Sequence, residues 1–214
     1  MSAHERWLDA LSPLLLERLP APPASVVDLG CGPRGGFVPM LRAAGYEAVG
    51  IDPEAPDEAW YQRIEFERAD LEPVDAVVAS TSLHHVADPA QVIDHIAETL
   101  EPSGTVVVFE WASERFDEPT ARWCSDRVGS KESWLHELCE DPSGWLAHEH
   151  LHRGDELVRV LDERLERRLL EYGPYFFPDL TDTTEADERA AIDAGRIQAS
   201  RIDYVGTRPR SAHA

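Results

Sequence analysis

Apolar residues recur along the chain at two spacings, one typical of helices and one of buried strands. Residues 4–19 place apolar side chains three and four positions apart, which predicts a helix that ends before the prolines of 20–23. Pro13 inside this stretch predicts a kink or the start of a second turn. Short apolar runs predict strands at 26–29, 48–51, 64–67 (ending near Asp70), 75–79, 105–109, 168–172 and 202–206, and helices are predicted at 36–44, 89–100 and 185–194.

Strands and helices alternate from residue 26 to residue 109, and this alternation indicates the fold class. Strands that are continuous apolar runs, separated by helices, predict a parallel sheet covered on both faces. Between 110 and about 168 the alternation stops, and this stretch holds four of the six tryptophans. We therefore expect an α/β, Rossmann-like, doubly wound sheet of seven mostly parallel strands, with a helical insertion over the strand ends.

The sharpest motif is the glycine-rich turn that follows the first predicted strand, Val26-Val27-Asp28-Leu29-Gly30-Cys31-Gly32-Pro33-Arg34-Gly35-Gly36. Gly30, Gly32 and Gly35 have the G-x-G-x-x-G spacing of a dinucleotide fingerprint, in which backbone N–H groups approach a ligand closely. A plain turn between a strand and a helix can carry the same letters. Asp28, Asp52 and Asp70 strengthen the ligand-binding interpretation, because each lies at the end of a successive predicted strand, where such sheets bind ligands.

These residues resemble the class I S-adenosylmethionine-dependent methyltransferases, in particular the small-molecule group of methyltransferase type 11. The resemblance covers about residues 25–110 strongly and 168–208 moderately. That family has an acid two residues before the first glycine, as Asp28 precedes Gly30, and an LHH segment after the fourth strand, here 83–85. One position departs from the pattern: Arg34 stands where the family has its third glycine, and glycines follow at 35 and 36.

The resemblance implies a binding site for S-adenosylmethionine. It places Asp52 on the ribose hydroxyls and Pro53 against the adenine, with Asp70 and Leu71 near the adenine amino group. Ser80 and Thr81 would line the methionine end of the cofactor. The cofactor-binding candidates are therefore Asp28, Gly30, Gly32, Gly35, Asp52, Pro53, Asp70, Leu71, Ser80 and Thr81. The resemblance also implies that the last strand, 202–206, is antiparallel.

This interpretation divides a single methyltransferase domain, 1–214, into four parts. An N-terminal helical cap covers 1–20, a cofactor-binding core 24–110, a helical insertion or lid 111–167, and the last strands 168–208. We expect the cap and the insertion to form the acceptor pocket. The tryptophans of the insertion then serve as packing or as a stacking platform for a substrate.

His84 and His85 are the candidate catalytic residues, since an imidazole titrates near neutral pH and can take a proton from an acceptor hydroxyl or amine. The alternative is that one imidazole packs under the cofactor and the other bonds a backbone carbonyl. Many methyltransferases rely on positioning alone. No metal site is expected: the three alternating histidines of 148–152 fit the surface of a lid or the rim of the acceptor pocket better than a ligand set.

Charge and composition narrow the classes of partner. The chain has 20 Lys and Arg against 41 Asp and Glu, a net charge of −21, which disfavours binding to nucleic acid and to anionic membranes. Three cysteines without CxxC spacing predict a reducing compartment, and no signal peptide or membrane span is expected, so the location predicted is cytoplasmic.

The predicted function is methyl transfer from S-adenosylmethionine to an O, N or C atom of a small molecule. Two alternatives stay open: an NAD(P)-dependent oxidoreductase, and a protein that binds S-adenosylmethionine without catalysis. Asp28 and Asp70 weigh against the oxidoreductase, as does Lys131, the only lysine, which has no tyrosine four residues before it. The acceptor and the oligomeric state are not predicted.

Overall fold

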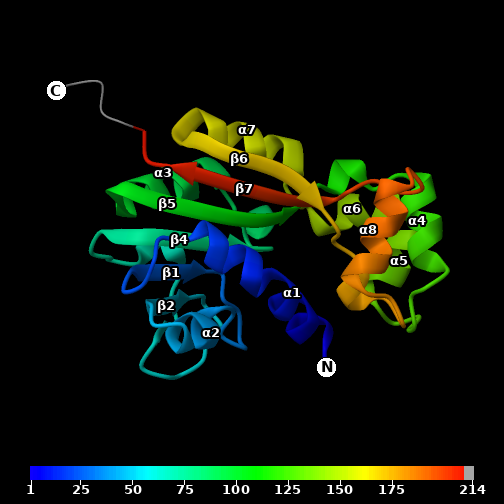
Figure 1. The fold of residues 1–214 in the computed structure, drawn as a ribbon. Coiled ribbons are helices and arrows are strands. Elements are labelled where there is room, and N and C mark those ends of the chain that lie inside the picture. Colours follow the sequence, from blue (N-terminus) through cyan, green and yellow to red (C-terminus); the bar gives the residue numbers. More distant parts are fainter. Residues whose placement is uncertain (210–214) are drawn as a thin grey trace.

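The computed structural model describes residues 1–209 and contains a sheet of seven strands with helices on both faces (Figure 1). The strands are β1 (Ser25–Leu29), β2 (Glu47–Ile51), β3 (Tyr61–Gln62), β4 (Val74–Ser80), β5 (Leu100–Trp111), β6 (Glu166–Gly173) and β7 (Arg201–Thr207). They lie in the order β3-β2-β1-β4-β5-β7-β6. Strands β1 to β5 pair in parallel, while β7 runs antiparallel to β5 and β6. The predicted Rossmann-like fold, with its antiparallel last strand, is confirmed.

The helices begin and end at local signals that the sequence carries. They are α1 (Ala3–Arg18), α2 (Val38–Ala43), α3 (Pro89–Thr99), α4 (Glu118–Ser125), α5 (Trp134–Glu140), α6 (Pro142–Glu149), α7 (Gly154–Arg164) and α8 (Glu185–Asp193). Single 3-10 turns are η1 (Phe66–Arg68), η2 (Leu83–His85), η3 (Ser113–Arg115) and η4 (Phe177–Asp179). Asp88 caps α3, because its carboxylate accepts the N–H groups of Ala90 and Gln91. Helix α1 continues through Pro13 as one segment.

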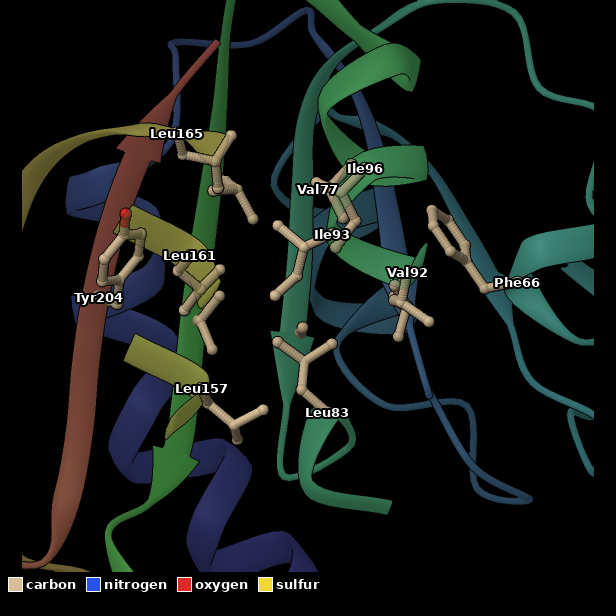
Figure 2. Packing of buried hydrophobic residues seen from close by; sticks show 14 of the residues in the cluster. Phe66, Val77, Leu83, Val92, Ile93, Ile96, Leu157, Leu161, Leu165 and Tyr204 are labelled. Carbon is tan, nitrogen blue, oxygen red and sulfur yellow. The ribbon is translucent and has the colours of Figure 1, made fainter. Parts of the chain in front are cut away.

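Both faces of the sheet are buried, and each is covered by its own pair of helices. Helices α3 and α7 cover one face, where Ile93 and Leu161 pack beside Val77 and Tyr204 of the strands (Figure 2). Helices α1 and α2 cover the other face through a second cluster of buried residues, which includes Leu11, Leu15, Phe37, Leu41 and Phe109. The exclusion of water from both faces explains why the central strands read as continuous apolar runs.

The helices of the predicted insertion, 111–167, join different parts of the core, because α7 belongs to the layer that covers the sheet. Its apolar stripe of Leu157, Leu161 and, just beyond the helix, Leu165 packs into the same core as α3. Helices α4, α5 and α6 instead form a third hydrophobic cluster, together with Ala191 of α8 and the aromatic residues near η4. Figure 1 shows this group of helices beside the carboxyl ends of the strands.

The third strand was predicted at 64–67, and this prediction is wrong. The strand is Tyr61–Gln62, and the chain continues into η1, where Phe66 is buried against His95 of α3 with a ring separation of 4.9 Å. The alternation of apolar and polar residues at 64–67 is compatible with a strand, and it is equally compatible with a turn that buries Phe66. No helix within residues 1–209 is long and apolar enough to cross a membrane.

Candidate functional site

Three cavities meet at the carboxyl ends of β1, β2 and β4. The chain runs from β1 outward to β2 and β3, then returns to β4 on the other side of β1, and such a switch point leaves a crevice between the two strands. The strand-tip cavity has a volume of about 760 Å³, the glycine-turn cavity about 400 Å³ and the aromatic cavity about 360 Å³. Thr81, at the end of β4, lines all three.

Two glycines of the turn hold positions that no other residue can occupy. Gly30 has a φ of +75°, and a Cβ there would overlap the side chain of Ser82. Gly36 has a φ of +52°, and a Cβ there would overlap the carboxylate of Asp28. The turn therefore brings bare backbone to the walls of the cavities.

Gly35 lies differently from the prediction. It backs onto the ring of Tyr61 and is not among the residues that line the cavities, whereas Gly36 and Arg34 line the glycine-turn cavity. The loop is effectively one residue longer than the family pattern, since Arg34 stands where the third glycine is expected. Gly36, after Gly30 and Gly32, is the third glycine of the turn that lines the glycine-turn cavity.

Asp52 links the glycine turn to the end of β2. Its carboxylate accepts the N–H of Gly32 at 3.0 Å and the N–H of Glu54 at 2.7 Å. Asp52, which was predicted from its place at a strand end, and Pro53, which was implied by the family resemblance, both line the strand-tip cavity. The carboxylate is thus fixed at the wall of this cavity by two backbone donors.

Asp28 is buried, with 2% of its surface exposed, and lines the glycine-turn cavity. Its carboxylate accepts the N–H of Phe37 at 2.6 Å. Burial raises the pKa of Asp28 to about 7, with a further contribution from the charge of Asp52, although the hydrogen bond from Phe37 acts in the opposite direction. This carboxyl group therefore changes its charge near neutral pH.

Ser80 and Thr81 connect β4 with the N-terminal helix and with β5. The hydroxyl of Ser80 accepts the indole N–H of Trp7 at 3.0 Å, and the N–H of Thr81 donates to the carbonyl of Phe109 at 2.8 Å. Thr81 has a φ of +52°, which is strained for a β-branched residue, and such strain is concentrated at functional positions. The strained residue lies where the three cavities join.

Asp70 and Leu71 are not brought to this site. Asp70 is exposed and lines none of the three cavities, while Leu71 lines a hollow beside Trp60 and Glu47, at the starts of the strands. The cause is the early end of β3: by residue 70 the chain has passed η1 and is returning to the start of β4. Residues 65–68 line the strand-tip cavity instead.

His84 forms a buried pair with Glu110, a residue that the sequence analysis did not consider. The His84 Nδ1 lies 2.5 Å from Glu110 Oε2, and Glu110 also accepts the N–H groups of Leu83 and Trp111. Burial alone would lower the pKa of His84, but the charge and hydrogen bond of Glu110 reverse this and raise it. Burial would raise the pKa of Glu110, but His84 and the backbone donors lower it. Asp28 was identified as a candidate because it is an acid at the end of a predicted strand. The same criterion would have identified Glu110.

His85 lies at the junction of the aromatic and strand-tip cavities, with its ring 4.1 Å from that of His84. Burial lowers the pKa of His85, and the neighbouring charge of His84 lowers it further. His85 is therefore a neutral imidazole at neutral pH. It is available to accept a proton beside the point where the cavities meet.

The aromatic cavity lies between α1, β5 and the third hydrophobic cluster. The rings of Trp111, Trp134 and Trp145 line it, with centroid separations of 5.8 to 6.1 Å. The ring of Tyr175 stacks on Trp111 at 5.7 Å and also contacts Trp7 of α1 at 5.3 Å. The cap and the insertion thus both contribute to the walls, although packing between the rings accounts for part of this arrangement.

Helix α1 is held over the site by Arg6. Its guanidinium donates to the carbonyls of Pro178, Leu180 and Thr183, which follow η4 or belong to it. His4 and Trp7, on the same helix, line both the glycine-turn and the aromatic cavity. The sequence indicated an amphipathic helix but carried no signal for the roles of these particular residues.

The alternating histidines do not come together. His148 lies in the last turn of α6 and His150 ends that helix in a left-handed conformation. His152 bonds to η2: its N–H donates to the carbonyl of His84, and its Nε2 lies 2.9 Å from the carbonyl oxygen of Val86. In the part of the chain that the structure describes, no three His, Cys, Asp or Glu residues form a group suited to a metal ion.

This geometry agrees with comparisons to known proteins. Residues 2–164 match the family model described as a methyltransferase domain, and the chain belongs to that methyltransferase family. A solved S-adenosylmethionine-dependent methyltransferase from Mesorhizobium loti has the same fold, with a TM-score of 0.61 and 20% identity over 93% of this chain and 99% of that one.

Two curated relatives match parts of the chain. It is 30% identical over 125 residues to the ubiquinone biosynthesis O-methyltransferase of Xylella fastidiosa, which covers 49% of this chain and 50% of that protein. It is 43% identical over 56 residues to the 2-ketoarginine methyltransferase of Streptomyces arginensis, which covers 26% of this chain and 17% of that protein. The matched segments span at most half the length of either relative.

Proposed function

We propose that this protein transfers a methyl group from S-adenosylmethionine to a small-molecule acceptor. The observation that carries the proposal is the junction at Thr81, where two cavities along the strand ends join a third, aromatic one. A donor and an acceptor that bind on opposite sides of this junction have their reacting atoms close to each other. Membership in the methyltransferase family supports the same conclusion.

The residues along the strand ends fit the parts of S-adenosylmethionine. Asp52 offers a fixed carboxylate to ribose hydroxyls, and Pro53 and Phe66 offer apolar surface to an adenine in the strand-tip cavity. In the glycine-turn cavity, Asp28 offers a carboxylate to a positively charged group, and the bare backbone of the turn leaves room for close approach. When bound, S-adenosylmethionine supplies a methyl group on a sulfonium sulfur, which takes the electron pair of the broken carbon–sulfur bond.

The chain contributes mainly by positioning and by removing a proton. The new bond joins the acceptor atom to the methyl carbon, and the proton leaving an acceptor hydroxyl or amine passes to the neutral imidazole of His85. Burial lowers the pKa of His85, and His84, which is held by Glu110 with its ring centroid 4.1 Å away, lowers it further; both effects favour the neutral form of His85. In this proposal His85 is the catalytic residue and His84 a positioning residue.

The acceptor is a small molecule in this proposal, because the aromatic cavity has a volume of only about 360 Å³. The net charge of −21 supports the exclusion of nucleic acid and of anionic membrane surfaces as partners. Free thiols at Cys31, Cys124 and Cys139 support the prediction of a reducing, cytoplasmic location.

Calorimetric titration with S-adenosylhomocysteine tests the donor site. We expect Asp52→Asn to weaken binding by about 1.5–3 kcal/mol, the scale of a lost hydrogen bond to a charged group. Asp70→Asn is the matched control: it removes the other candidate acid, which lies outside the cavities, and should leave the affinity unchanged. Stabilisation of the protein by NAD and not by S-adenosylhomocysteine would refute the proposal and favour the oxidoreductase.

Turnover separates an enzyme from a protein that only binds the cofactor. Incubation with S-adenosylmethionine and a cellular extract of small metabolites should release S-adenosylhomocysteine, measured by mass spectrometry, and heat-inactivated protein serves as the control. Replacing His85 with alanine should slow this release. A cofactor bound tightly and never converted would identify a non-catalytic binding protein.

A further inference from the structure

The charge of the aromatic cavity points to a class of acceptor. Within residues 1–209, fourteen residues line this cavity, most of them aromatic, apolar or imidazole side chains, and neither an arginine nor a lysine is among them. Two of them, Glu149 and Asp179, are carboxylates. A cavity without a lysine or arginine is poorly suited to a carboxylate or phosphate on the ligand, because nothing in its walls neutralises a buried negative charge.

The histidines of the cavity do not reverse this balance. Burial lowers the pKa of His4 and the charge of Arg34 lowers it further, while burial and His84 lower the pKa of His85. Both imidazoles are therefore neutral at neutral pH. His84 is paired with the carboxylate of Glu110, so it offers no unpaired positive charge to a ligand.

Asp179 is held at the wall by one of the tryptophans. The indole N–H of Trp134 donates to Asp179 Oδ1 at 3.2 Å, which fixes both the carboxylate and the ring. Burial raises the pKa of Asp179, although the bond from Trp134 and the charge of Arg6 oppose this effect. The guanidinium of Arg6 is itself bound to three backbone carbonyls. Arg6 therefore acts on Asp179 through its charge alone, because its N–H groups are engaged by the backbone carbonyls.

Three aromatic rings of different orientation line the cavity together with Asp179. Trp134 and Trp145 meet at 42°, and each meets Trp111 at 64–70°, with all three centroid separations near 6 Å. A positively charged nitrogen group is attracted to aromatic faces within about 6 Å of their centroids, more strongly where water is excluded. Rings at different angles beside a carboxylate therefore favour the binding of a cationic group over that of a neutral one.

We infer that the acceptor carries a cationic nitrogen group, an ammonium or a guanidinium, which binds between Trp134, Trp145 and the carboxylate of Asp179. This inference rests on the proposed function. The cation lies at the end of the cavity formed by α5, α6 and η4, and the atom to be methylated lies at the other end, beside Thr81 and His85. The cationic group selects and orients the acceptor and is not the nucleophile.

A set of isosteric probes tests this inference. Choline is compared with 3,3-dimethylbutan-1-ol, in which carbon replaces the charged nitrogen, and with the anion 3,3-dimethylbutanoate; methylguanidinium distinguishes the two kinds of cation. Binding is measured by quenching of tryptophan fluorescence in the presence of saturating S-adenosylhomocysteine. We expect one of the cations to bind at least tenfold more tightly than the neutral probe, and the anion to bind least.

Paired variants locate the effect. Asp179→Asn keeps an oxygen that accepts the Trp134 N–H and should remove most of the preference for the cation, while the affinity for the neutral probe stays unchanged. Asp182→Asn, three residues further on and exposed, is the matched control and should behave as wild type. Trp145→Leu should weaken cation binding, and Trp145→Phe should restore part of it.

The outcomes separate this inference from the proposed function. If S-adenosylhomocysteine fails to bind the wild-type protein, the proposed function is refuted. If it binds, but the neutral probe or the anion binds as tightly as both cations, the inference about the acceptor is wrong while the methyltransferase proposal stands. Retention of the cation preference in Asp179→Asn would equally overturn the assignment of that carboxylate.

Discussion

Single carboxyl groups at the ends of the strands differ sharply in their surroundings. Asp52 is held by two backbone N–H groups at the cavity wall, whereas Asp28 is buried and has a pKa of about 7. Glu110 is as deeply buried as Asp28, yet its pKa is lowered because His84 is paired with it. The same chemical group can therefore serve as a fixed acceptor, a group that titrates near neutrality or half of an ion pair, according to its neighbours.

The titration of Asp28 predicts a pH dependence of ligand binding. A ligand that places a positive charge beside Asp28 binds the ionised carboxylate, so the affinity for S-adenosylhomocysteine should fall as the pH drops below about 7. The decrease should approach about tenfold per pH unit at most. Titration calorimetry in buffers of different ionisation enthalpy should detect proton release on binding near pH 6.5. In Asp28→Asn, both the proton release and this pH dependence should disappear; persistence of either would show that another group titrates.

The pair of His84 and Glu110 predicts a window of stability. The raised pKa of His84 stabilises the folded protein below its ordinary value of 6.5, and this contribution is lost as the pH rises through the raised pKa. The lowered pKa of Glu110 contributes above its ordinary value of 4.5, and this part is lost as the pH falls through the lowered pKa. The difference in Tm between wild type and the double variant His84→Asn/Glu110→Gln should therefore be largest between pH 4.5 and 6.5. A difference that is constant from pH 4 to pH 9 would mean that the pair does not titrate on unfolding.

At the scale of elements, helix α1 acts as the cover of the site. It packs on the sheet through Leu11 and Leu15, and its first turns extend over the glycine-turn and aromatic cavities. Arg6 is the tie between these first turns and η4. The cover is therefore anchored at both ends, by apolar packing on one side and by hydrogen bonds from a charged donor on the other.

Removal of the Arg6 tie should loosen α1 without unfolding the sheet. We expect Arg6→Ala to lower the free energy of unfolding by about 1.5–3 kcal/mol, as for hydrogen bonds to a charged group. Hydrogen exchange should increase in residues 3–10 and remain unchanged in β1 and β4. Arg122→Ala, which removes only an exposed pair with Glu118, is the control and should cost well under about 1 kcal/mol. Equal effects of the two variants would contradict the role assigned to Arg6.

The sequence predicted those elements whose signals are local. Continuous β-branched runs located β1, β4 and β5, and the Asp88-Pro89 cap located the start of α3. The glycine turn and Asp52 were found because strand, turn and acid are close in the chain. Asp70 was expected beside Asp52 and lies outside the three cavities, because its position depends on where β3 ends, and an alternating segment does not determine that.

Residues that act through tertiary contacts had no local signal. Glu110 stands 26 positions after His84, and Arg6 bonds to carbonyls more than 170 positions away. Helices α4 to α6 are short and pack mainly on one another, so their periodicity was too weak to separate them from α7. Helices α4 to α6 differ from α7 in the hydrophobic cluster that they join, and only the tertiary structure shows this difference.

At the scale of the whole molecule, the buried residues are divided into three hydrophobic clusters, and this division determines which parts of the chain support each cavity. Two clusters cover the faces of the sheet, and the third holds α4, α5, α6 and α8 together beside the strand ends. The strand-tip cavity is formed chiefly by strand ends, η1 and the start of α3, and the glycine-turn cavity by the glycine turn and α1, whereas the aromatic cavity takes part of its wall from the third cluster. In the proposed function, the donor and the acceptor therefore depend on different parts of the core.

This division predicts that the third cluster can be weakened separately. Leu138 of α5 is fully buried, and Leu138→Ala should remove about 2–5 kcal/mol from the cluster. Hydrogen exchange should then increase in 118–149 and 185–193, while the central strands keep their protection. The affinity of Leu138→Ala for S-adenosylhomocysteine should equal that of the wild type. Ile93→Ala, at a buried position in the core beneath the sheet, is the comparison and should increase exchange in the strands; an identical pattern in the two variants would mean that the molecule unfolds as one unit.

The positions of the two chain ends have a practical consequence. Ala3 and His4 line the aromatic cavity, whereas Thr207 pairs with Thr105 at the opposite edge of the sheet, where the parallel strands begin (Figure 1). An affinity tag or fluorescent fusion joined before Met1 would stand beside the aromatic cavity, the acceptor site of the proposed function, and would compete with a ligand that enters it. A reporter or purification tag is better joined after Thr207, which lies on the side of the sheet opposite the three cavities.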